Sequence, residues 1–187
     1  MPQAKARDSV RVEHDLLGDR DIPADAYWGV HTLRAIENFP ITGTTIGLWP
    51  ELIRAIALVK HAAAQTNFEL GELDEAKAKL IMSACGEIAN GALHDQFVVD
   101  QIQGGAGTST NMNANEVIAN RALELAGRPR GDYAFLHPIE HVNMSQSTND
   151  VYPTALMVAR RCATAVRWTA MDELNGAFAA KSLEFEN

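Results

Sequence analysis

The sequence predicts a mainly helical protein that begins with a short irregular or β-hairpin segment. Apolar residues recur at helical spacing in four stretches, which cover residues 50–71, 72–90, 115–126 and 153–187. Before residue 50, frequent prolines and glycines exclude a long helix, and the stretch VRVEHDLLG suits a short strand pair or a turn. Of the 187 residues 47% are hydrophobic and 21% charged, so the chain can bury a core of ordinary size.

The first two expected helices follow each other between residues 50 and 90. Pro50 suits the first turn of one helix, and Gly71 suits the stop between the two. The apolar stripe of the first helix consists of Leu52, Ile56, Val59 and Ala63. The stripe of the second consists of Leu73, Ala76, Leu80 and Ala84.

The third expected helix spans residues 115–126 and follows a segment, 91–103, without clear periodicity. It ends before Gly127, a residue suited to a left-handed C-cap. Asn113 and Glu116 have the spacing of a capping pair at its start. A polar loop follows the helix.

The last stretch keeps helical apolar spacing from Pro153 to the end of the chain, which corresponds to roughly 50 Å of helix. Its stripe consists of Leu156, Ala159, Ala163, Val166, Ala170 and Leu174. The alanines would let a partner helix come close, yet the chain supplies no obvious partner. We therefore expect residues 1–150 to form a mostly helical N-terminal domain. Residues 151–187 are expected to begin a longer helical-bundle domain that continues beyond this chain.

Composition and charge exclude several classes of protein. No apolar run approaches the roughly 20 residues needed to span a bilayer, and the first residues, MPQAKARDSVRVEHD, lack the apolar region of a secretory signal. We therefore expect a cytoplasmic protein that does not bind a membrane. The net charge of -8 argues against a general nucleic-acid binder, which needs a basic face.

The cysteines and histidines indicate neither a disulfide nor a metal site. Cys85 and Cys162 each lie among small and aliphatic residues, which predicts two buried, reduced thiols. His137 and His141 are four positions apart, but Pro138 lies between them. A shared helical face, and with it a metal site, is therefore not expected.

Two polar stretches stand immediately before expected helices and have similar chemistry. One is GGAGTSTNMNAN, which starts at Gly104, and the other is NMSQSTNDVYPTA, which starts at Asn143. Helix N-termini expose unpaired N–H groups and the positive end of the helix dipole, and therefore suit an anion. Hydroxyls and amides can orient a carboxylate and can also accept from an amino group.

The same residue types also form helix caps, and their spacing does not separate a cap from a binding site. A phosphate-binding loop is excluded because no Gly-Lys-Ser/Thr follows, and no Ser-His-Asp arrangement can be read. The residues alone indicate either caps or a site for an anion or zwitterion, and they leave the chemistry open.

Two stretches closely resemble characteristic regions of the aspartase/fumarase superfamily. They are GGAGTSTNMNANEVIANRA and HVNMSQSTNDVYPTA. The N-terminal stretch DLLGDRDIPADAYWGVHTLRAIENFPITG resembles the aspartate ammonia-lyase branch in particular, and the resemblance runs along nearly the whole chain. Class II fumarases usually have Ser-Ser-Asn-Asp-Thr-Phe-Pro where this chain has STNDVYP from Ser147, and Gln where it has Ser109. Both differences favour the aspartase branch.

The resemblance implies a carbon–nitrogen lyase that reversibly eliminates ammonia from L-aspartate to give fumarate, without a cofactor. It also implies a homotetramer built around a bundle of long helices, with each active site assembled from three subunits. By position in the motifs, Thr108 and Ser109 would contact the amino group and the side-chain carboxylate of the substrate. Ser147 and Thr148 would bind the same carboxylate, and Asn149 would reach the amino group.

The chain departs from the family pattern in two respects. The family's catalytic base is a serine on a mobile Gly-Ser-Ser loop, accompanied by a lysine and an asparagine, and we expect these beyond residue 187. The chain alone is therefore expected to be inactive. The stretch HPIEHVN departs from the fumarase-like H-P-N-D-x-V-N at Ile139 and Glu140, so His137 is interpreted as a loop residue with local hydrogen bonds. The alternatives are a class II fumarase, another lyase of the superfamily, or a non-catalytic oligomerisation domain.

Overall fold

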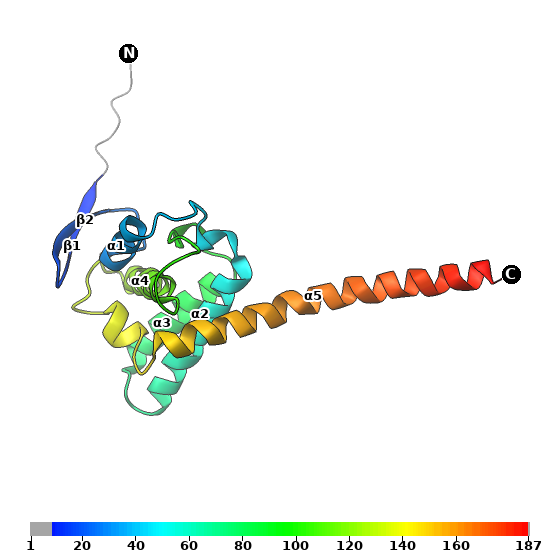
Figure 1. The fold of residues 1–187 in the computed structure, drawn as a ribbon. Coiled ribbons are helices and arrows are strands. Elements are labelled where there is room, and N and C mark those ends of the chain that lie inside the picture. Colours follow the sequence, from blue (N-terminus) through cyan, green and yellow to red (C-terminus); the bar gives the residue numbers. More distant parts are fainter. Residues whose placement is uncertain (1–8, 187) are drawn as a thin grey trace, which may run out of the picture.

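The computed structural model describes residues 9–186, except for the side chains of Ala165 and Val166. The chain is mainly helical and starts with a hairpin, as predicted. Its strands and α-helices are β1 (Val10–Asp15), β2 (Gly18–Pro23), α1 (Val30–Asn38), α2 (Pro50–Glu69), α3 (Glu75–Ala89), α4 (Thr108–Leu125) and α5 (Thr148–Phe185). Shorter helical turns lie at Ile46–Leu48, His94–Gln96 and, in π geometry, Pro138–Val142. Figure 1 shows a compact head from which α5 projects.

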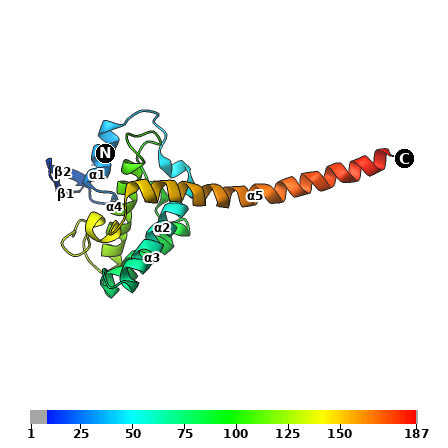
Figure 2. The ribbon, with the colours of Figure 1, turned by 60° about the horizontal axis from the view of Figure 1, so that its bottom comes forward.

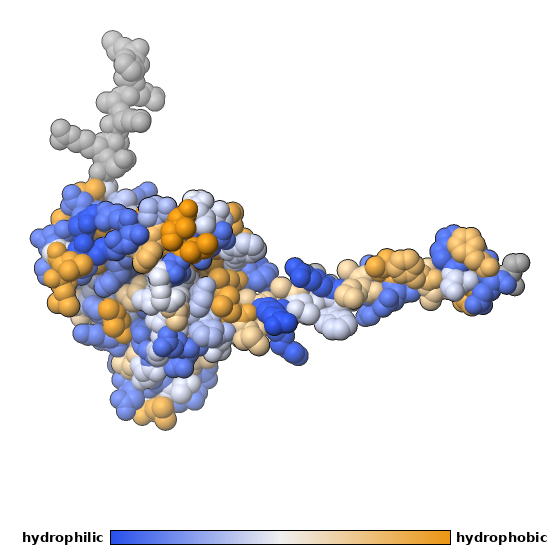
Figure 3. Space-filling model, in the orientation of Figure 1, coloured by the Kyte–Doolittle hydropathy of each residue, from blue (hydrophilic) through white to orange (hydrophobic). Residues whose placement is uncertain are grey.

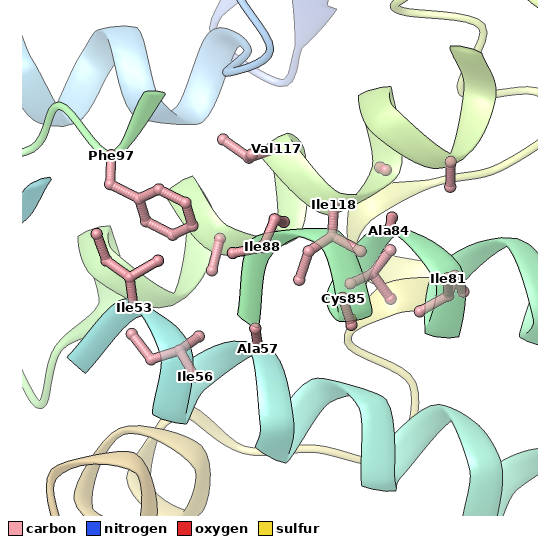
Figure 4. Packing of buried hydrophobic residues seen from close by; sticks show 14 of the residues in the cluster. Ile53, Ile56, Ala57, Ile81, Ala84, Cys85, Ile88, Phe97, Val117 and Ile118 are labelled. Carbon is pink, nitrogen blue, oxygen red and sulfur yellow. The ribbon is translucent and has the colours of Figure 1, made fainter. Parts of the chain in front are cut away.

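The core of the head lies between α2, α3 and α4. Figure 4 shows side chains of these three helices meeting one another and Phe97, and each is at most 2% exposed. Those labelled from the helices are Ile53, Ile56, Ala57, Ile81, Ala84, Cys85, Ile88, Val117 and Ile118. Burying one such isoleucine contributes about 1.5–3 kcal/mol. This packing fixes the position of α4, which carries the first polar stretch at its N-terminus.

Helices α2 and α3 confirm the two predicted helices, but their buried faces differ from the predicted stripes. In α2, Val59 is half-buried, whereas Ile53 and Ala57 are fully buried. In α3, Ala76 is exposed, whereas Ile81 is fully buried. The physical reason is that α2 packs on both α3 and α5, and α3 on both α2 and α4, so each buried face is wider than one stripe.

Helix α1 was not predicted, because its N-terminus is satisfied by residues far away in the sequence. Its N-cap, Gly29, provides no side-chain cap. Instead the Glu13 carboxylate accepts from the N–H of Val30 at 2.8 Å, and the Glu116 carboxylate accepts from the N–H groups of Gly29 and Thr32 at 2.7 and 3.1 Å. Local sequence therefore carries no capping signal for this helix.

Helix α4 begins at Thr108, well before the expected start at residue 115. Asn113 is consequently no cap: it lies inside the helix and is fully buried. Its amide donates to the carbonyl of Gln96 at 3.0 Å and accepts from the N–H of Val98 at 2.9 Å. Hydroxyl and amide side chains have low helix propensity, and residues 108–114 were therefore predicted to form a loop. Tertiary hydrogen bonds outweigh that propensity here.

Helix α5 confirms the long last helix and passes through Gly176 without a break. It begins at Thr148, so that Pro153 lies inside the helix rather than in its first turn. Proline has no N–H, and the carbonyl of Asn149 therefore lacks its usual helical donor. The division of the chain near residue 150 stays a prediction.

From Arg167 to Phe185, the residues of α5 are all exposed. Figures 1 and 2 show this part extending away from the head, and Figure 3 shows apolar side chains along it. The large ones include Trp168, Met171, Leu174, Phe178 and Phe185. In the predicted stripe, Ala159 packs on the head, and the side chain of Val166 lies outside the described residues.

The two cysteines differ in their surroundings. Cys85 is fully buried, as predicted, and burial raises the pKa of its thiol to about 12, so the thiol stays protonated. The prediction was wrong for Cys162, which is exposed on α5 because no other helix of the described chain covers that part. Residues 9–186 contain no helix with the length and apolar character needed to cross a membrane.

Candidate functional site

The N-terminus of α4 presents two predicted binding residues. Gly107 precedes the helix with φ +84° and caps it without a side chain. Gln103 accepts from the N–H of Thr110 at 3.0 Å and also donates to its hydroxyl. For the N–H groups of Thr108 and Ser109, the described residues supply no hydrogen-bond acceptor. These two groups remain available to an anion, favoured by the positive end of the helix dipole.

The N-terminus of α5 carries the other three predicted residues. The Ser147 hydroxyl caps the helix by accepting from the N–H of Asn149 at 3.2 Å. The Ser147 carbonyl accepts from the N–H groups of Asp150 and Val151, both at 3.0 Å. The capping interpretation therefore holds for Ser147 in this structure. The side chain of Asn149 is exposed, and that of Thr148 is half-buried.

The structure brings these two helix starts together. The Asn111 amide, in the first turns of α4, donates to the Thr148 hydroxyl of α5 at 3.4 Å. Gly107 lies against the ring of Tyr152, so closely that a Cβ atom at this glycine would stand 2.2 Å from the ring carbon Cγ. The predicted residues at 108–109 and 147–149 thus belong to adjoining helix N-termini, although they are far apart in sequence.

Substituting Gly107→Ala should lower the free energy of unfolding by about 2–5 kcal/mol, because positive φ and a steric overlap with Tyr152 act together. Gly127→Ala is a matched control, since Gly127 has φ +69° but nothing within 4 Å of the added methyl group. The control should lose only about 1–2 kcal/mol. Urea unfolding of both variants measures the difference. Equal losses would show that the Tyr152 ring moves aside and does not hold the two helix starts together.

A network of amides centred on the half-buried Asn143, which sequence reasoning missed, supports both helix starts. The Asn143 carbonyl oxygen accepts from Lys60 at 2.7 Å, from Asn111 at 3.0 Å and from Asn115 at 3.2 Å. Burial of Lys60 lowers the pKa of its side chain to about 7. The helical spacing of α2 could have revealed this lysine. Lys60 lies on the same face of the helix as the buried apolar residues, where a solvent-exposed charge is not expected.

A second buried cluster joins the hairpin, α1 and α4 at some distance along α4 from the site. Glu116 is fully buried and accepts from the N–H of His31 at 2.8 Å and from its ring nitrogen Nδ1 at 3.0 Å. This hydrogen bond raises the pKa of His31. Desolvation raises the pKa of Glu13, which also accepts from the Tyr133 hydroxyl at 3.0 Å. The cluster anchors α1 and does not reach the helix starts at 108 and 148.

His31 should make the fold more stable in weak acid than in weak base. Its pKa in the folded protein is raised by Glu116, so the charged imidazole contributes its full stabilisation below the unfolded pKa, about 6.5. The contribution is lost as the pH rises through the raised, folded pKa. The stability gap between the wild type and His31→Gln should therefore be larger at pH 5.5 than at pH 9 in urea unfolding. A gap that does not change with pH would contradict the ion pair.

His137 makes local hydrogen bonds, as interpreted, although it caps the π-helical turn Pro138–Val142 instead of lying in an irregular loop. The Nδ1 atom of His137 accepts from the N–H groups of Ile139 and Glu140 at 3.1 and 3.2 Å. The Nδ1 atom of His141 accepts from the N–H of His137 at 2.8 Å. In the described part of the chain, no group of three or more His, Cys, Asp or Glu residues could hold a metal ion.

Comparison with known sequences finds one family of relatives along most of the chain. A family model described as "Lyase" matches residues 18–187. The chain is 53% identical over 177 residues to an aspartate ammonia-lyase of Pseudomonas aeruginosa, covering 95% of this chain and 37% of that protein. It is 52% identical to the aspartate ammonia-lyase of Bacillus subtilis with the same two coverages. The chain thus spans little more than a third of the length of these relatives.

Solved structures share the fold. A fumarate lyase:delta crystallin from Brucella melitensis in native form matches with a TM-score of 0.92 and 56% identity, over 96% of this chain and 42% of that one. A class II fumarase from Schistosoma mansoni matches with a TM-score of 0.75 and 36% identity, over 81% of this chain and 32% of that one. The family model, the relatives and the fold agree, and the chain therefore belongs to the aspartase/fumarase family of lyases.

Proposed function

We propose that the chain is the N-terminal part of an aspartate ammonia-lyase, which converts L-aspartate reversibly to fumarate and ammonia. The observation that carries the proposal is that the polar N-termini of α4 and α5 adjoin each other. At the N-terminus of α4, the N–H groups of Thr108 and Ser109 have no hydrogen-bond partner within the described chain. Unpaired N–H groups at a helix N-terminus favour a carboxylate. The relatives named above support aspartate as the substrate, since their names state that activity.

In the proposed site, five side chains contact the substrate. Thr108 and Ser109 contact the amino group and the side-chain carboxylate, Ser147 and Thr148 bind the same carboxylate, and Asn149 reaches the amino group. Hydroxyls suit this task because they donate to a carboxylate and accept from an ammonium group. The Ser147 hydroxyl already accepts from the N–H of Asn149, and its own proton stays free to be donated.

The reaction requires charge stabilisation rather than a cofactor. A base removes a proton from C3, the electron pair is delocalised into the side-chain carboxylate as an aci-carboxylate, and the C–N bond then breaks with loss of ammonia. Donors that bind the doubly charged intermediate more tightly than the substrate lower the barrier. The residues proposed here supply these donors, and the base, a serine, is proposed to come from a segment outside residues 1–187.

The assembly proposed for the whole enzyme is a homotetramer in the cytoplasm, with three subunits contributing to each site. The support is the exposed apolar surface of α5, which a helical bundle would cover. A class II fumarase is the alternative, favoured by the shared fold but with the lower identity of 36%, against 53% for the aspartate ammonia-lyase of Pseudomonas aeruginosa.

The test is to express the full-length protein and to follow ammonia release from L-aspartate and fumarate formation from L-malate. The proposal predicts release of ammonia from aspartate and little or no reaction with malate. Efficient dehydration of malate without any reaction of aspartate would assign the protein to the fumarases instead. No reaction with either substrate would favour a non-catalytic oligomerisation domain.

A further inference from the structure

Lys60 is a fully buried lysine in the third turn of α2. Its ammonium nitrogen donates to the Asn143 carbonyl oxygen at 2.7 Å, and the described residues offer it no other hydrogen bond. Burying an amine costs free energy that an apolar side chain of similar length, such as methionine, would not incur. Packing alone therefore does not account for a lysine here. The polar contact with Asn143 is the feature that distinguishes it.

Asn143 connects three parts of the structure through one side-chain amide. Its carbonyl oxygen accepts from Asn111 and Asn115 of α4 as well as from Lys60 of α2. Its nitrogen donates to the carbonyl of Gln146 at 3.1 Å. Gln146 immediately precedes the proposed binding residues at 147–149. Asn143 therefore holds the turn that leads into α5, while Lys60 and α4 hold Asn143.

The same network reaches the candidate site by a second route. The Asn111 nitrogen that contacts Asn143 at 3.0 Å also lies 3.4 Å from the Thr148 hydroxyl oxygen. From α2, the Asn67 amide donates to the carbonyl of Met144 at 3.0 Å and holds the same turn. Displacing Asn143 would therefore shift the position of the Asn111 amide and of the turn at 143–146 together.

We propose that Lys60 is a positioning residue: by anchoring Asn143 it fixes the turn at 143–146 and the place of the Thr148 hydroxyl. The inference rests on the proposed function, because it concerns residues assigned to substrate binding there. Within the described chain, Lys60 itself makes no hydrogen bond to the five proposed binding residues. It acts through hydrogen bonds that it can donate as an amine or as an ammonium ion.

Lys60→Met in the full-length protein tests the proposal, because methionine keeps the length and removes the donor. We expect kcat/KM to fall about tenfold to a hundredfold, since displacement of a binding group by about 1 Å can cost a hundredfold. Amide hydrogen exchange in residues 143–149 should become at least about tenfold faster as that turn opens more readily. The thermal midpoint should stay unchanged or rise, because a buried amine is removed. Lys79→Met, at an exposed lysine of α3, is the matched control and should change none of these quantities.

Asn143→Asp is a second variant for the case that Lys60→Met does not fold. A carboxylate still accepts from Lys60, Asn111 and Asn115 but no longer donates to the Gln146 carbonyl. It should give the same loss of kcat/KM and the same faster exchange in residues 143–149.

The proposal is overturned by a folded Lys60→Met protein with wild-type kcat/KM and wild-type exchange, or by one with a lower thermal midpoint as its only change. Faster exchange with unchanged kinetics would also overturn it, since the turn would then not set the site. If the wild-type enzyme does not react with L-aspartate, the proposed function fails separately. The exchange measurement needs no reaction, and it still decides whether Lys60 holds the turn.

Discussion

A polypeptide of residues 1–187 alone should produce no measurable fumarate from L-aspartate, even when it is folded and concentrated. In the proposed site the chain supplies donors for the side-chain carboxylate and acceptors for the ammonium group, but its sequence contains no Gly-Ser-Ser loop. Loss of a positioned base alone costs about a hundred- to ten-thousandfold in rate. Without partners for the second carboxylate, the substrate would also be poorly oriented. Fumarate absorbance measures the product, and the full-length protein at equal concentration is the control.

Sustained fumarate formation by this polypeptide, purified free of full-length protein, would show that the base lies within residues 1–187.

The same polypeptide should also self-associate through α5. Trp168, Met171 and Leu174 are each more than half exposed, and apolar surface of this kind drives association. Size-exclusion chromatography should therefore show oligomers. A strictly monomeric polypeptide at high concentration would contradict the expectation that α5 belongs to a helical bundle.

Thr108→Ala or Asn149→Ala in the full-length protein should lower turnover about a hundred- to a thousandfold, the usual loss when one transition-state donor is removed. The folded protein should lose no more than about 1 kcal/mol, since neither side chain serves as the cap of its helix. Steady-state kinetics and urea unfolding of the same samples measure both quantities.

Thr66→Ala is the matched control for these two variants. Thr66 is exposed on α2, and its hydroxyl donates to the carbonyl of Ala62 at 2.9 Å rather than to any of the five proposed binding residues. It should leave turnover unchanged. If Thr108→Ala and Asn149→Ala behave like this control, their side chains do not bind the reacting groups, and the substrate contacts proposed for them are wrong.

The sequence predicted helices well where apolar residues recur at helical spacing over a long stretch. Helices α2, α3 and α5 have long apolar patterns, and their existence followed from spacing alone. The start of α4 could not be predicted, because Asn113 is stable inside a helix only through partners in the segment at 96–98. Helix α1 could not be predicted for the same reason, since the hydrogen bonds at its N-terminus come from Glu13 and Glu116. Tertiary partners decided both cases.

The candidate site was predicted in part. The motif positions named residues at 108–109 and 147–149, and the structure brings those two helix starts together. The supporting network of Lys60, Asn111 and Asn143 was missed, because three residues from separate elements meet only in the folded chain. Periodicity shows that Lys60 lies on a buried face, but it does not reveal the partner.

The most direct test of the account is a crystal structure of the full-length protein with bound L-aspartate or fumarate. The account predicts one substrate carboxylate between the N-termini of α4 and α5, with oxygen atoms about 2.5–3.0 Å from the hydroxyls of Thr108 and Thr148. In the aspartate complex, Asn149 should contact the amino group. A dicarboxylate bound elsewhere, with the hydroxyls of Thr108 and Thr148 contacting protein or water only, would contradict the central claim.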